Sequence, residues 1–325
     1  MKKRIFSGAQ PTGELHIGNY LGAIKNWVKL QDEYESFYCI VNLHAITLPQ
    51  KPEILRKKTL DLARIYLAAG VNPETSTIFI QSDVSEHAEL AWTLNCIARM
   101  GELERMTQFK DKSKGNAERS SVGLFDYPVL MVSDILLYQT DLVPVGQDQK
   151  QHLELTRDLA ERFNRDFGET FVVPQAYIPP VGAKIMSLKD PSKKMSKSDE
   201  NLNASIFLLD DADTITRKIK KAVTDSGTAI TFDESRPAIT NLLTIYQLMS
   251  GKTSEECEVN FEGKGYGDFK RELAEVVVEY MKPFQEKVKD YDDAELSKIL
   301  KNGAEKAREV ASVTLKDVYE KMGIN

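Results

Sequence analysis

The chain has 325 residues, of which 42% are hydrophobic and 28% are charged. These are ordinary values for a globular protein, and the length is enough for two domains with a substantial buried core. The formal net charge of −6 excludes a strongly basic nucleic-acid-binding chain, so any RNA contact must rely on local patches of lysine and arginine.

Strands and helices are predicted to alternate over the first part of the chain. The expected strands are short apolar runs at 4–8, 37–43 and 77–81, with the end of another at 141–146. The expected helices, from apolar residues at helical spacing, are 16–30, 51–69, 86–100 and 149–163. This order predicts an α/β fold with a parallel sheet, in the manner of a Rossmann-like nucleotide-binding domain.

The character of the sequence changes near residue 187. Residues 187–203 are rich in Lys, Ser and Asp and are predicted to form an exposed loop. The chain beyond them is predicted to be almost wholly helical, apart from a glycine-rich break at 261–267. The expected helices are 212–223, 237–250, 268–288, 294–309 and 312–322. We therefore expect a Rossmann-like parallel-sheet domain over 1–187 and an all-helical domain over 188–325, whose last helices are candidates to pack back onto the first domain.

A loop and a helix start follow the first predicted strand. Residues 10–13 (QPTG) have turn chemistry, and residues 16–19 (HIGN) place His16 and Asn19 on one face of the first helical turn. The N-terminus of a helix after a parallel strand can bind an anion through its free N–H groups and its dipole. The segment is a candidate phosphate site, with a plain strand–turn–helix as an equal alternative.

A lysine-rich loop at the predicted domain junction is the second motif. Residues 193–198 (KKMSKS) could be a merely solvated charge run, which is the usual fate of such loops. Beside a nucleotide-binding domain, however, lysines of a loop can neutralise the charge of a leaving pyrophosphate. Other nucleotide motifs fail, because residues 251–253 (GKT) have Tyr246 where a Walker A glycine would stand, and the glycines of 263–267 follow no strand.

Asp134 lies inside an otherwise apolar helical run at 127–138. One interpretation places it on the solvated stripe of an amphipathic helix, beside Ser133. The other makes it an acceptor in an apolar pocket, because a buried carboxylate requires a partner. An indole N–H would suit that acceptor, and so would a tyrosine phenol, so Asp134 alone does not separate the two ligands.

The motifs taken together resemble the class I aminoacyl-tRNA synthetases. Residues 16–19 are similar to their HIGH signature, with Asn in place of the last His, and residues 194–198 match their KMSKS signature. Residues 101–112 (GELERMTQFKDK), 146–152 (GQDQKQH) and 154–158 (ELTRD) resemble blocks of the bacterial-type tryptophanyl-tRNA synthetases. The resemblance extends from residue 4 to the last helices, and it favours tryptophan over tyrosine.

The resemblance implies a role for particular residues, which fall into three groups. Those implied to catalyse are Gln10 in the first loop and Lys112, Lys194 and Lys197, which are implied to face the triphosphate. Those implied to bind ATP are Gln10, Pro11, Thr12, Gly18, Asn19, Gly146, Gln147, Asp148, Ile185, Lys194, Met195, Ser196, Lys197 and Ser198, with His16 and Ile17 completing the HIGH-like motif. Those implied to bind tryptophan are Asp134 at the indole N–H, Tyr127 and Gln149 near the ammonium, and the walls Phe6, His44, Met131, Val143 and Val145. For the apolar members, ordinary core packing is the alternative.

The resemblance also implies a reaction and its partners. The expected enzyme is a ligase that activates L-tryptophan with ATP and Mg²⁺ and then loads tRNA(Trp), as a homodimer without zinc or an iron–sulfur cluster. Basic residues within 217–221 and 270–271 are candidate tRNA contacts, although such charges are usually solvated. The alternatives are a tyrosyl-tRNA synthetase, a catalytically silent paralogue that binds tryptophan or RNA, and a small nucleotidyltransferase. Two departures from the family are a loop at 113–121 that is about one residue longer than expected and Gln147 where Glu is common.

Cysteine usage and targeting signals complete the expectations. No apolar segment follows the basic N-terminus, and no run of 18 apolar residues occurs, so neither a signal peptide nor a membrane span is predicted and the expected location is the cytoplasm. The three cysteines are far apart, which excludes a zinc site built from cysteine alone. We expect free, buried thiols at Cys39, Cys96 and Cys257.

Overall fold

The computed structural model describes residues 2–107, 120–144, 146, 149–177, 184–197 and 199–324. Within this part of the chain, a five-stranded sheet has the strand order β3-β2-β1-β4-β5, and every pairing is parallel. The strands are β1 (Arg4–Ala9), β2 (Glu35–Ile40), β3 (Ser76–Ile80), β4 (Leu142–Pro144) and β5 (Gln175–Tyr177). The predicted α/β class with a parallel sheet and a following helical region is therefore confirmed.

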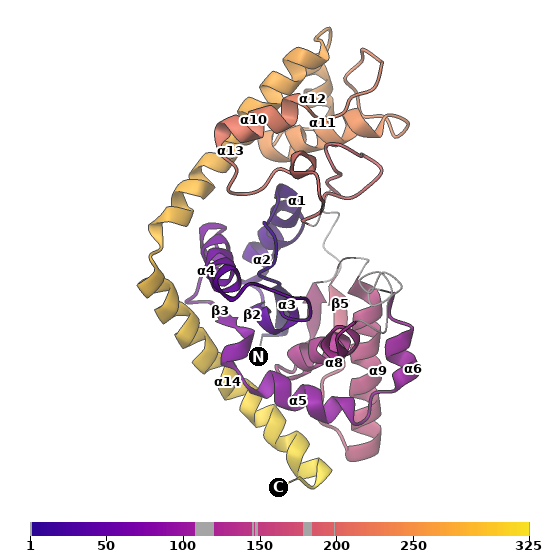
Figure 1. The fold of residues 1–325 in the computed structure, drawn as a ribbon, viewed down its shortest axis with the longest axis vertical. Helices are drawn as coiled ribbons and strands as arrows, with labels where there is room; N and C mark the ends of the chain where they lie inside the picture. Colours follow the sequence, from indigo (N-terminus) through magenta and orange to yellow (C-terminus); the bar gives the residue numbers. More distant parts are fainter. Residues whose placement is uncertain are drawn as a thin grey trace.

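Helices surround this sheet and form the rest of the molecule (Figure 1). Those of the sheet domain are α1 (Ile17–Asn19), α2 (Lys25–Leu30), α3 (Asn42–Ala45), α4 (Pro52–Ala68), α5 (Glu86–Asn95), α6 (Met100–Glu104), α8 (Val122–Leu136) and α9 (Lys150–Phe167). Those that follow are α10 (Ala212–Lys220), α11 (Pro237–Ser250), α12 (Ser254–Phe261), α13 (Tyr266–Asp290) and α14 (Asp293–Met322). Short turns of other helix types are η1 (Tyr20–Ile24), η2 (Gln81–Asp83) and η5 (Leu202–Ala204).

The strands β1, β2 and β3 are largely buried, as their apolar sequences require. Successive side chains of a strand point to opposite faces. In β2, Tyr38 and Ile40 therefore pack into one hydrophobic core with α2, α4 and the helices after residue 210. Phe37 and Cys39 pack into the other core with α5, α8, α9 and α14. Helices on both faces are the condition under which a parallel sheet is stable.

The strand order has a switch point at β1. The chain moves from β1 through β2 to β3 on one side, and β4 and β5 lie on the other side. At such a point the connections after neighbouring strands diverge, which opens a crevice at the carboxyl ends of the strands. The fold therefore places a ligand site beyond the ends of β1 and β4.

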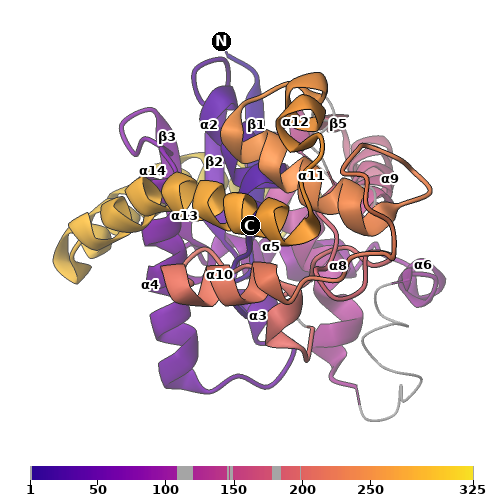
Figure 2. The same cartoon turned by 90° about the horizontal axis from the view of Figure 1, so that it is seen from above.

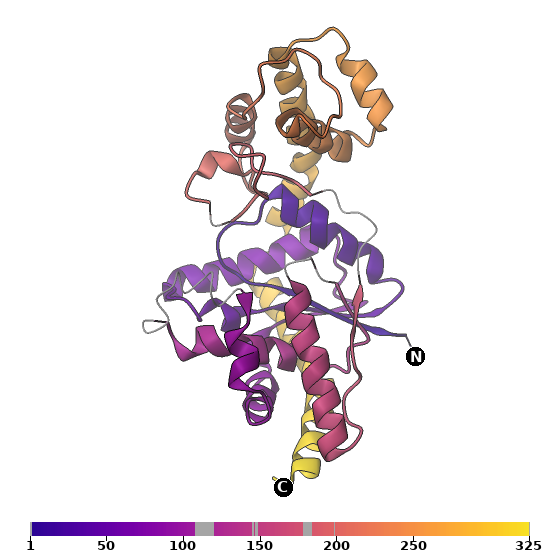
Figure 3. The ribbon, with the colours of Figure 1, turned by 90° about the vertical axis from the view of Figure 1, so that its right-hand side faces the viewer.

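The helical part lies at one end of the molecule, and the last helix returns to the sheet. Figures 1 and 3 both place α10, α11 and α12 together at one end of the long axis. In the view from above, α13 crosses over the sheet domain (Figure 2), where it contacts α4. The final helix α14 then packs on β3 and α5. The domain boundary near residue 187 stays a prediction, since one hydrophobic core includes residues from both sides of it.

The return of α14 to the sheet requires a glycine. A Cβ built on Gly303 would lie 1.8 Å from the carbonyl oxygen of Ile78 in β3, which no side chain tolerates. The backbone of the helix therefore rests directly on the backbone of the strand at this position.

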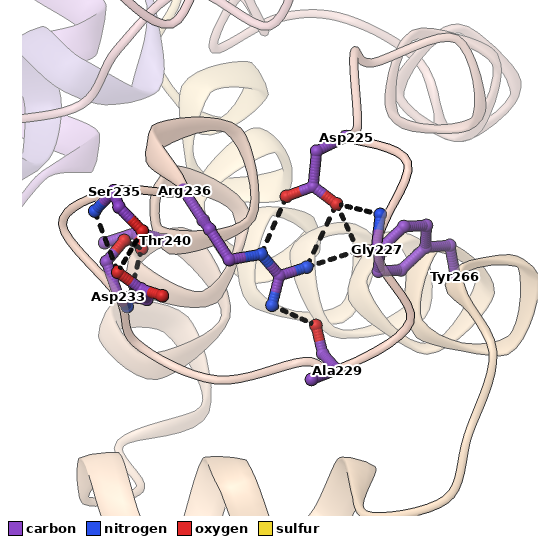
Figure 4. Close-up of polar contacts among 8 residues, drawn as sticks. All are labelled: Asp225, Gly227, Ala229, Asp233, Ser235, Arg236, Thr240 and Tyr266. Carbon is purple, nitrogen blue, oxygen red and sulfur yellow. Dashed lines mark hydrogen bonds and ion pairs between the residues drawn. The ribbon is translucent and has the colours of Figure 1, made fainter.

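The segment between α10 and α11 is an ordered loop rather than helix, and one arginine holds it together (Figure 4). The Arg236 guanidinium donates to both carboxylate oxygens of Asp225, at 2.9 and 3.0 Å, and to the carbonyl oxygen of Ala229 at 2.7 Å. The Tyr266 hydroxyl donates to Asp225 at 2.6 Å, which ties the loop to the start of α13. These hydrogen bonds lower the pKa of the Asp225 carboxyl.

Several sequence-based predictions of elements were wrong. The expected strand 37–43 ends at Ile40, and α3 begins at Asn42. The two helices expected at 294–309 and 312–322 are the single helix α14, while α12 and β5 were not predicted. The loop at 187–203 is only partly exposed, because Leu188 and Met195 lie in the hydrophobic core. Cys96 is exposed rather than buried.

Candidate active site

A cavity of about 460 Å³ opens where β1 and β4 end. Its lining includes Gly8, Ala9 and Gln10 at the end of β1, and Val143 and Pro144 of β4. The remaining lining residues are Phe6, Ser7, Thr12, Val41, His44, Tyr127, Met131, Asp134, Ile135, Gln149 and Lys197. The cavity therefore brings together most of the residues expected to hold tryptophan with Gln10, Thr12 and Lys197, which were expected at ATP.

Asp134 is buried at this cavity, so the interpretation of a solvated residue was wrong. Its side chain is 2% exposed, and both carboxylate oxygens accept hydrogen bonds. Oδ2 lies 2.7 Å from Nε2 of His44, while Oδ1 lies 2.6 Å from Nε2 of Gln81 and 2.6 Å from Nδ1 of His87. Because a carboxylate only accepts, each of these nitrogens must donate.

Burial and hydrogen bonding act in opposite directions on Asp134. Burial, the larger single effect, would raise the pKa of this carboxyl, but the charges and hydrogen bonds of His44 and His87 together lower it below its ordinary value. Asp134 is therefore ionised at neutral pH and presents a negative acceptor to the cavity.

The predicted pocket walls lie around this carboxylate. Phe6, Met131 and Val143 line the cavity as expected. His44 lines it too, but as a polar partner of Asp134 rather than only as a wall. The hydroxyl of Tyr127 lies 3.1 Å from Nε2 of the buried His152, and Tyr127 and Gln149 share the cavity with Asp134.

The HIGH-like motif caps its own helix. The amide of Asn19 donates to Nδ1 of His16 at 3.3 Å, and the amide of His16 donates to Oδ1 of Asn19 at 3.1 Å. A Cβ built on Gly18 would lie 3.0 Å from Nδ1 of His16 and 3.5 Å from Cβ of Ile185. Ile185 therefore lies close to the motif, and a side chain at position 18 would press on the imidazole.

Lys197 lines the cavity at the ends of β1 and β4 and also lies beside the first loop, residues 10–13. Lys197 also lines a second cavity of about 170 Å³ with Gln10, Pro11, Thr12 and Gly13. A Cβ built on Gly13 would lie 3.2 Å from the Cβ of Lys197. Burial and the nearby charge of Lys58 lower the pKa of Lys197 to about 8. Burial, with the charges of Lys197 and Lys194, lowers the pKa of His16 to about 3, so the imidazole is neutral at pH 7.

The rest of the lysine loop is held by the core. Met195 is buried, and its amide donates to the carbonyl of Ile185 at 3.0 Å. Lys194 is exposed, and its backbone pairs with that of Met186 in an isolated antiparallel β-bridge. The Ser196 carbonyl accepts from the Ser205 hydroxyl at 3.1 Å. Met195 therefore anchors the loop while the two lysines on either side of it differ in exposure.

Some expected site residues are not brought to the cavity lining or lie beyond the described part of the chain. Gly146 is exposed, and its carbonyl accepts from the amide of Gln149 at 3.1 Å. The predictions for Lys112, Val145, Gln147, Asp148 and Ser198 fall outside the described residues.

Two of the basic residues proposed to meet tRNA have structural roles. Lys218 is 3% exposed, with its ammonium 2.6 Å from Asp210 and 4.2 Å from the centre of the Phe207 ring. Lys270 donates to the carbonyl of Ala222 at 2.7 Å. Lys218 is thereby removed from the surface that an RNA could reach.

Sequence reasoning missed the partners of Asp134. Gln81 belongs to η2 and His87 to α5, so no local motif joins them to Asp134 in α8. The sequence contained one signal, because burying the Asp134 carboxylate costs free energy unless donors bond it. It did not identify which residues are those donors.

Two other kinds of feature are absent from the described part of the chain. No group of three or more His, Cys, Asp and Glu side chains in this part of the chain is placed to hold a metal ion. No helix in it has the length and apolar character needed to cross a membrane.

The chain is similar to known synthetases over its full length. The family model for tRNA synthetases class I (W and Y) matches residues 1–282. The chain is 58% identical over 323 residues to the tryptophan–tRNA ligase of Helicobacter pylori, with 99% of each protein covered. It therefore belongs to the class I tRNA synthetases of the tryptophan and tyrosine group. It is an aminoacyl-tRNA synthetase, as the motifs predicted.

Solved structures agree in fold over the whole chain. The tryptophanyl-tRNA synthetase of Mycoplasma pneumoniae is 38% identical, with a TM-score of 0.92 and coverage of 100% of this chain and 99% of that one. The Campylobacter jejuni tryptophanyl-tRNA synthetase complexed with ADP and tryptophan is 38% identical, with a TM-score of 0.85 and coverage of 98% and 99%.

Proposed function

We propose that this synthetase is a tryptophan–tRNA ligase that uses the cavity beyond β1 and β4 as its active site. Relatives that are more than half identical over their full length share this activity. L-tryptophan and ATP react to give tryptophanyl-adenylate and pyrophosphate, and the tryptophanyl group then passes to the terminal adenosine of tRNA(Trp).

The observation that carries the assignment of the amino-acid pocket is the buried carboxylate of Asp134. The cavity beside it has the apolar walls Phe6, Met131 and Val143. Indole is a large apolar ring with a single N–H donor, so one charged acceptor among apolar side chains matches it. A site built to bond a donor rejects a ligand without it, because the acceptor is left unpaired.

The ATP site is proposed to lie between the first loop and the lysine loop. Gln10 and Thr12 line both cavities together with Lys197, which brings a cation to the place where the triphosphate would lie. The carboxylate of tryptophan would attack the α-phosphate in line, and pyrophosphate would leave. Lysines 194 and 197 stabilise the charge that develops on it, and Mg²⁺ would accompany the phosphate oxygens of ATP.

Amino-acid-dependent exchange of pyrophosphate into ATP, measured with each of the twenty amino acids, tests this function. Exchange with tryptophan alone is the expected result. Exchange with tyrosine would keep the chemistry but refute the pocket assignment, and no exchange from a folded sample would favour a silent paralogue. A Lys197→Ala variant is expected to lose about 10²–10³ in rate.

The partners follow from the same function. We infer that the enzyme works in the cytoplasm, where tRNA is loaded for translation, and that the helical part after residue 200 meets the anticodon arm. We also infer a homodimer, whose interface includes the exposed apolar patch of Ile46, Leu48, Trp92 and Val122. The segments that carry these side chains lie side by side, because Ser121 donates to the Thr47 carbonyl and Asn95 of α5 donates to Asp126 of α8. Such a patch is typical of a contact surface.

A further inference from the structure

The polar side chains behind Asp134 form a chain that ends in the hydrophobic core. Nδ1 of His87 lies 2.6 Å from Asp134 Oδ1, and Nε2 of the same ring lies 2.8 Å from the hydroxyl of Tyr138. His87 and Tyr138 are both 0% exposed. Neither lines the cavity, so neither can touch a bound amino acid.

The donors to Oδ1 of Asp134 are fixed. The carboxylate accepts only, so Nδ1 of His87 carries a proton. The Tyr138 hydroxyl bonds the opposite ring nitrogen, Nε2, and can do so whether that nitrogen donates or accepts, because a hydroxyl does both. The orientation of the Gln81 amide is also fixed, because its Oε1 accepts from the amide of Leu43 at 3.0 Å and leaves Nε2 to donate to Asp134.

These contacts divide the two oxygens of Asp134. Both residues that bond Oδ1, Gln81 and His87, lie outside the cavity lining. Oδ2 is bonded by His44, which lines the cavity. Oδ1 is therefore bonded only by residues outside the cavity lining. We take Oδ2, whose partner lines the cavity, as the oxygen that faces a ligand.

The backbone and the rings around His87 hold it in place. The Ser133 hydroxyl, adjacent to Asp134 in α8, donates to the carbonyl of His87 at 2.7 Å. The ring of Tyr138 stacks on Phe37 at 4.6 Å and on Phe6 at 5.5 Å, and Phe6 lines the cavity. The same residues thus set the acceptor and support the wall on which an indole would pack.

We propose that His87, oriented by Tyr138, is a positioning residue for amino-acid specificity, which holds Asp134 so that Oδ2 accepts the indole N–H. This inference rests on the proposed role of Asp134 in the tryptophan site. A carboxylate fixed at one oxygen cannot turn to follow a ligand, and this rigidity raises the penalty for a ligand without the donor.

The test compares tryptophan with 3-(3-benzothienyl)alanine, in which sulfur replaces the indole N–H. The quantity measured is the ratio of the inhibition constant of the analogue in pyrophosphate exchange to the KM for tryptophan. The wild type is expected to prefer tryptophan. His87→Leu is expected to reduce this preference about tenfold or more while the KM for ATP changes little.

Conservative variants separate positioning from packing. His87→Asn places an amide nitrogen near the position of Nδ1 and is expected to retain most of the preference. Tyr138→Phe keeps the stacked ring but removes the hydroxyl, and is expected to reduce the preference severalfold. Tyr38→Phe is the matched control, because it removes a buried hydroxyl that donates to the Trp27 carbonyl in the other core, and its ratio should equal that of the wild type.

The outcomes distinguish the proposed role of His87 from the proposed role of Asp134 in the tryptophan site. If Asp134→Ala keeps the preference for tryptophan, the proposed indole site is wrong. If Asp134→Ala abolishes the preference while a folded His87→Leu retains it, only the role of His87 is overturned. Should His87→Leu fail to fold, an unchanged ratio in Tyr138→Phe overturns the inference instead.

Discussion

The pKa of Lys197 depends on its surroundings. Its pKa is lowered to about 8 by burial and by Lys58, so a rise in pH removes the proton earlier than from an ordinary lysine. The neutral amine cannot neutralise phosphate charge. We therefore expect kcat/KM for ATP in pyrophosphate exchange to fall above about pH 8, approaching tenfold per pH unit.

A Lys197→Arg variant provides the control for this profile. The guanidinium stays charged throughout the accessible range, so the alkaline fall should disappear even if the absolute rate is lower. An identical fall in the variant would assign the titration to another group.

The residues of the site were predictable to different degrees. Residues 10–13, 16–19 and 194–197 are contiguous motifs, and the structure brings both ends of this set to the cavities through Gln10, Thr12 and Lys197. The buried state of Asp134 was only one of two interpretations, because a helical stripe has the same spacing whether it faces water or a pocket. Its donors come from separate elements, so only the folded chain reveals them.

At the scale of elements, the contact between α14 and β3 leaves no room for a side chain at position 303. A methyl group on Gly303 cannot fit against the Ile78 carbonyl, so Gly303→Ala must shift the helix outward. We expect a loss of about 1–3 kcal/mol in the free energy of unfolding, measured by urea denaturation. Gly267→Ala in α13 is the control, because a Cβ there meets nothing within 4 Å, and its stability should be equal or slightly higher.

Element prediction failed where local signals are ambiguous. The apolar run FYCIVNL contains the end of a strand and the start of a helix, and apolar character alone does not distinguish them. The helix α12 had a readable signal that was overlooked, since Thr253 and Glu256 form a capping box at its start. The continuity of α14 depends on its packing along β3 and α5, which no local pattern reveals.

At the scale of the whole molecule, the apolar patch on α5 and α8 makes the dimer testable. Trp92 is 72% exposed and Val122 is 80% exposed. We expect Val122→Glu to shift the enzyme from dimer to monomer in sedimentation velocity, because a charge would be buried at the interface. Val259→Glu on α12, at an apolar residue 72% exposed, is the matched control and should leave the dimer intact. A monomeric wild type would refute the dimer.

The position of α14 also determines when this protein can finish folding. β3 is an edge strand of the sheet, and its backbone is covered by the final helix of the chain. During synthesis the sheet strands emerge first, and the residues that cover this edge emerge only after all of them. Until then the nascent chain presents an uncovered strand edge, which is a template for association with other chains. Premature termination before residue 293 should therefore yield chains that aggregate rather than shorter, working enzymes.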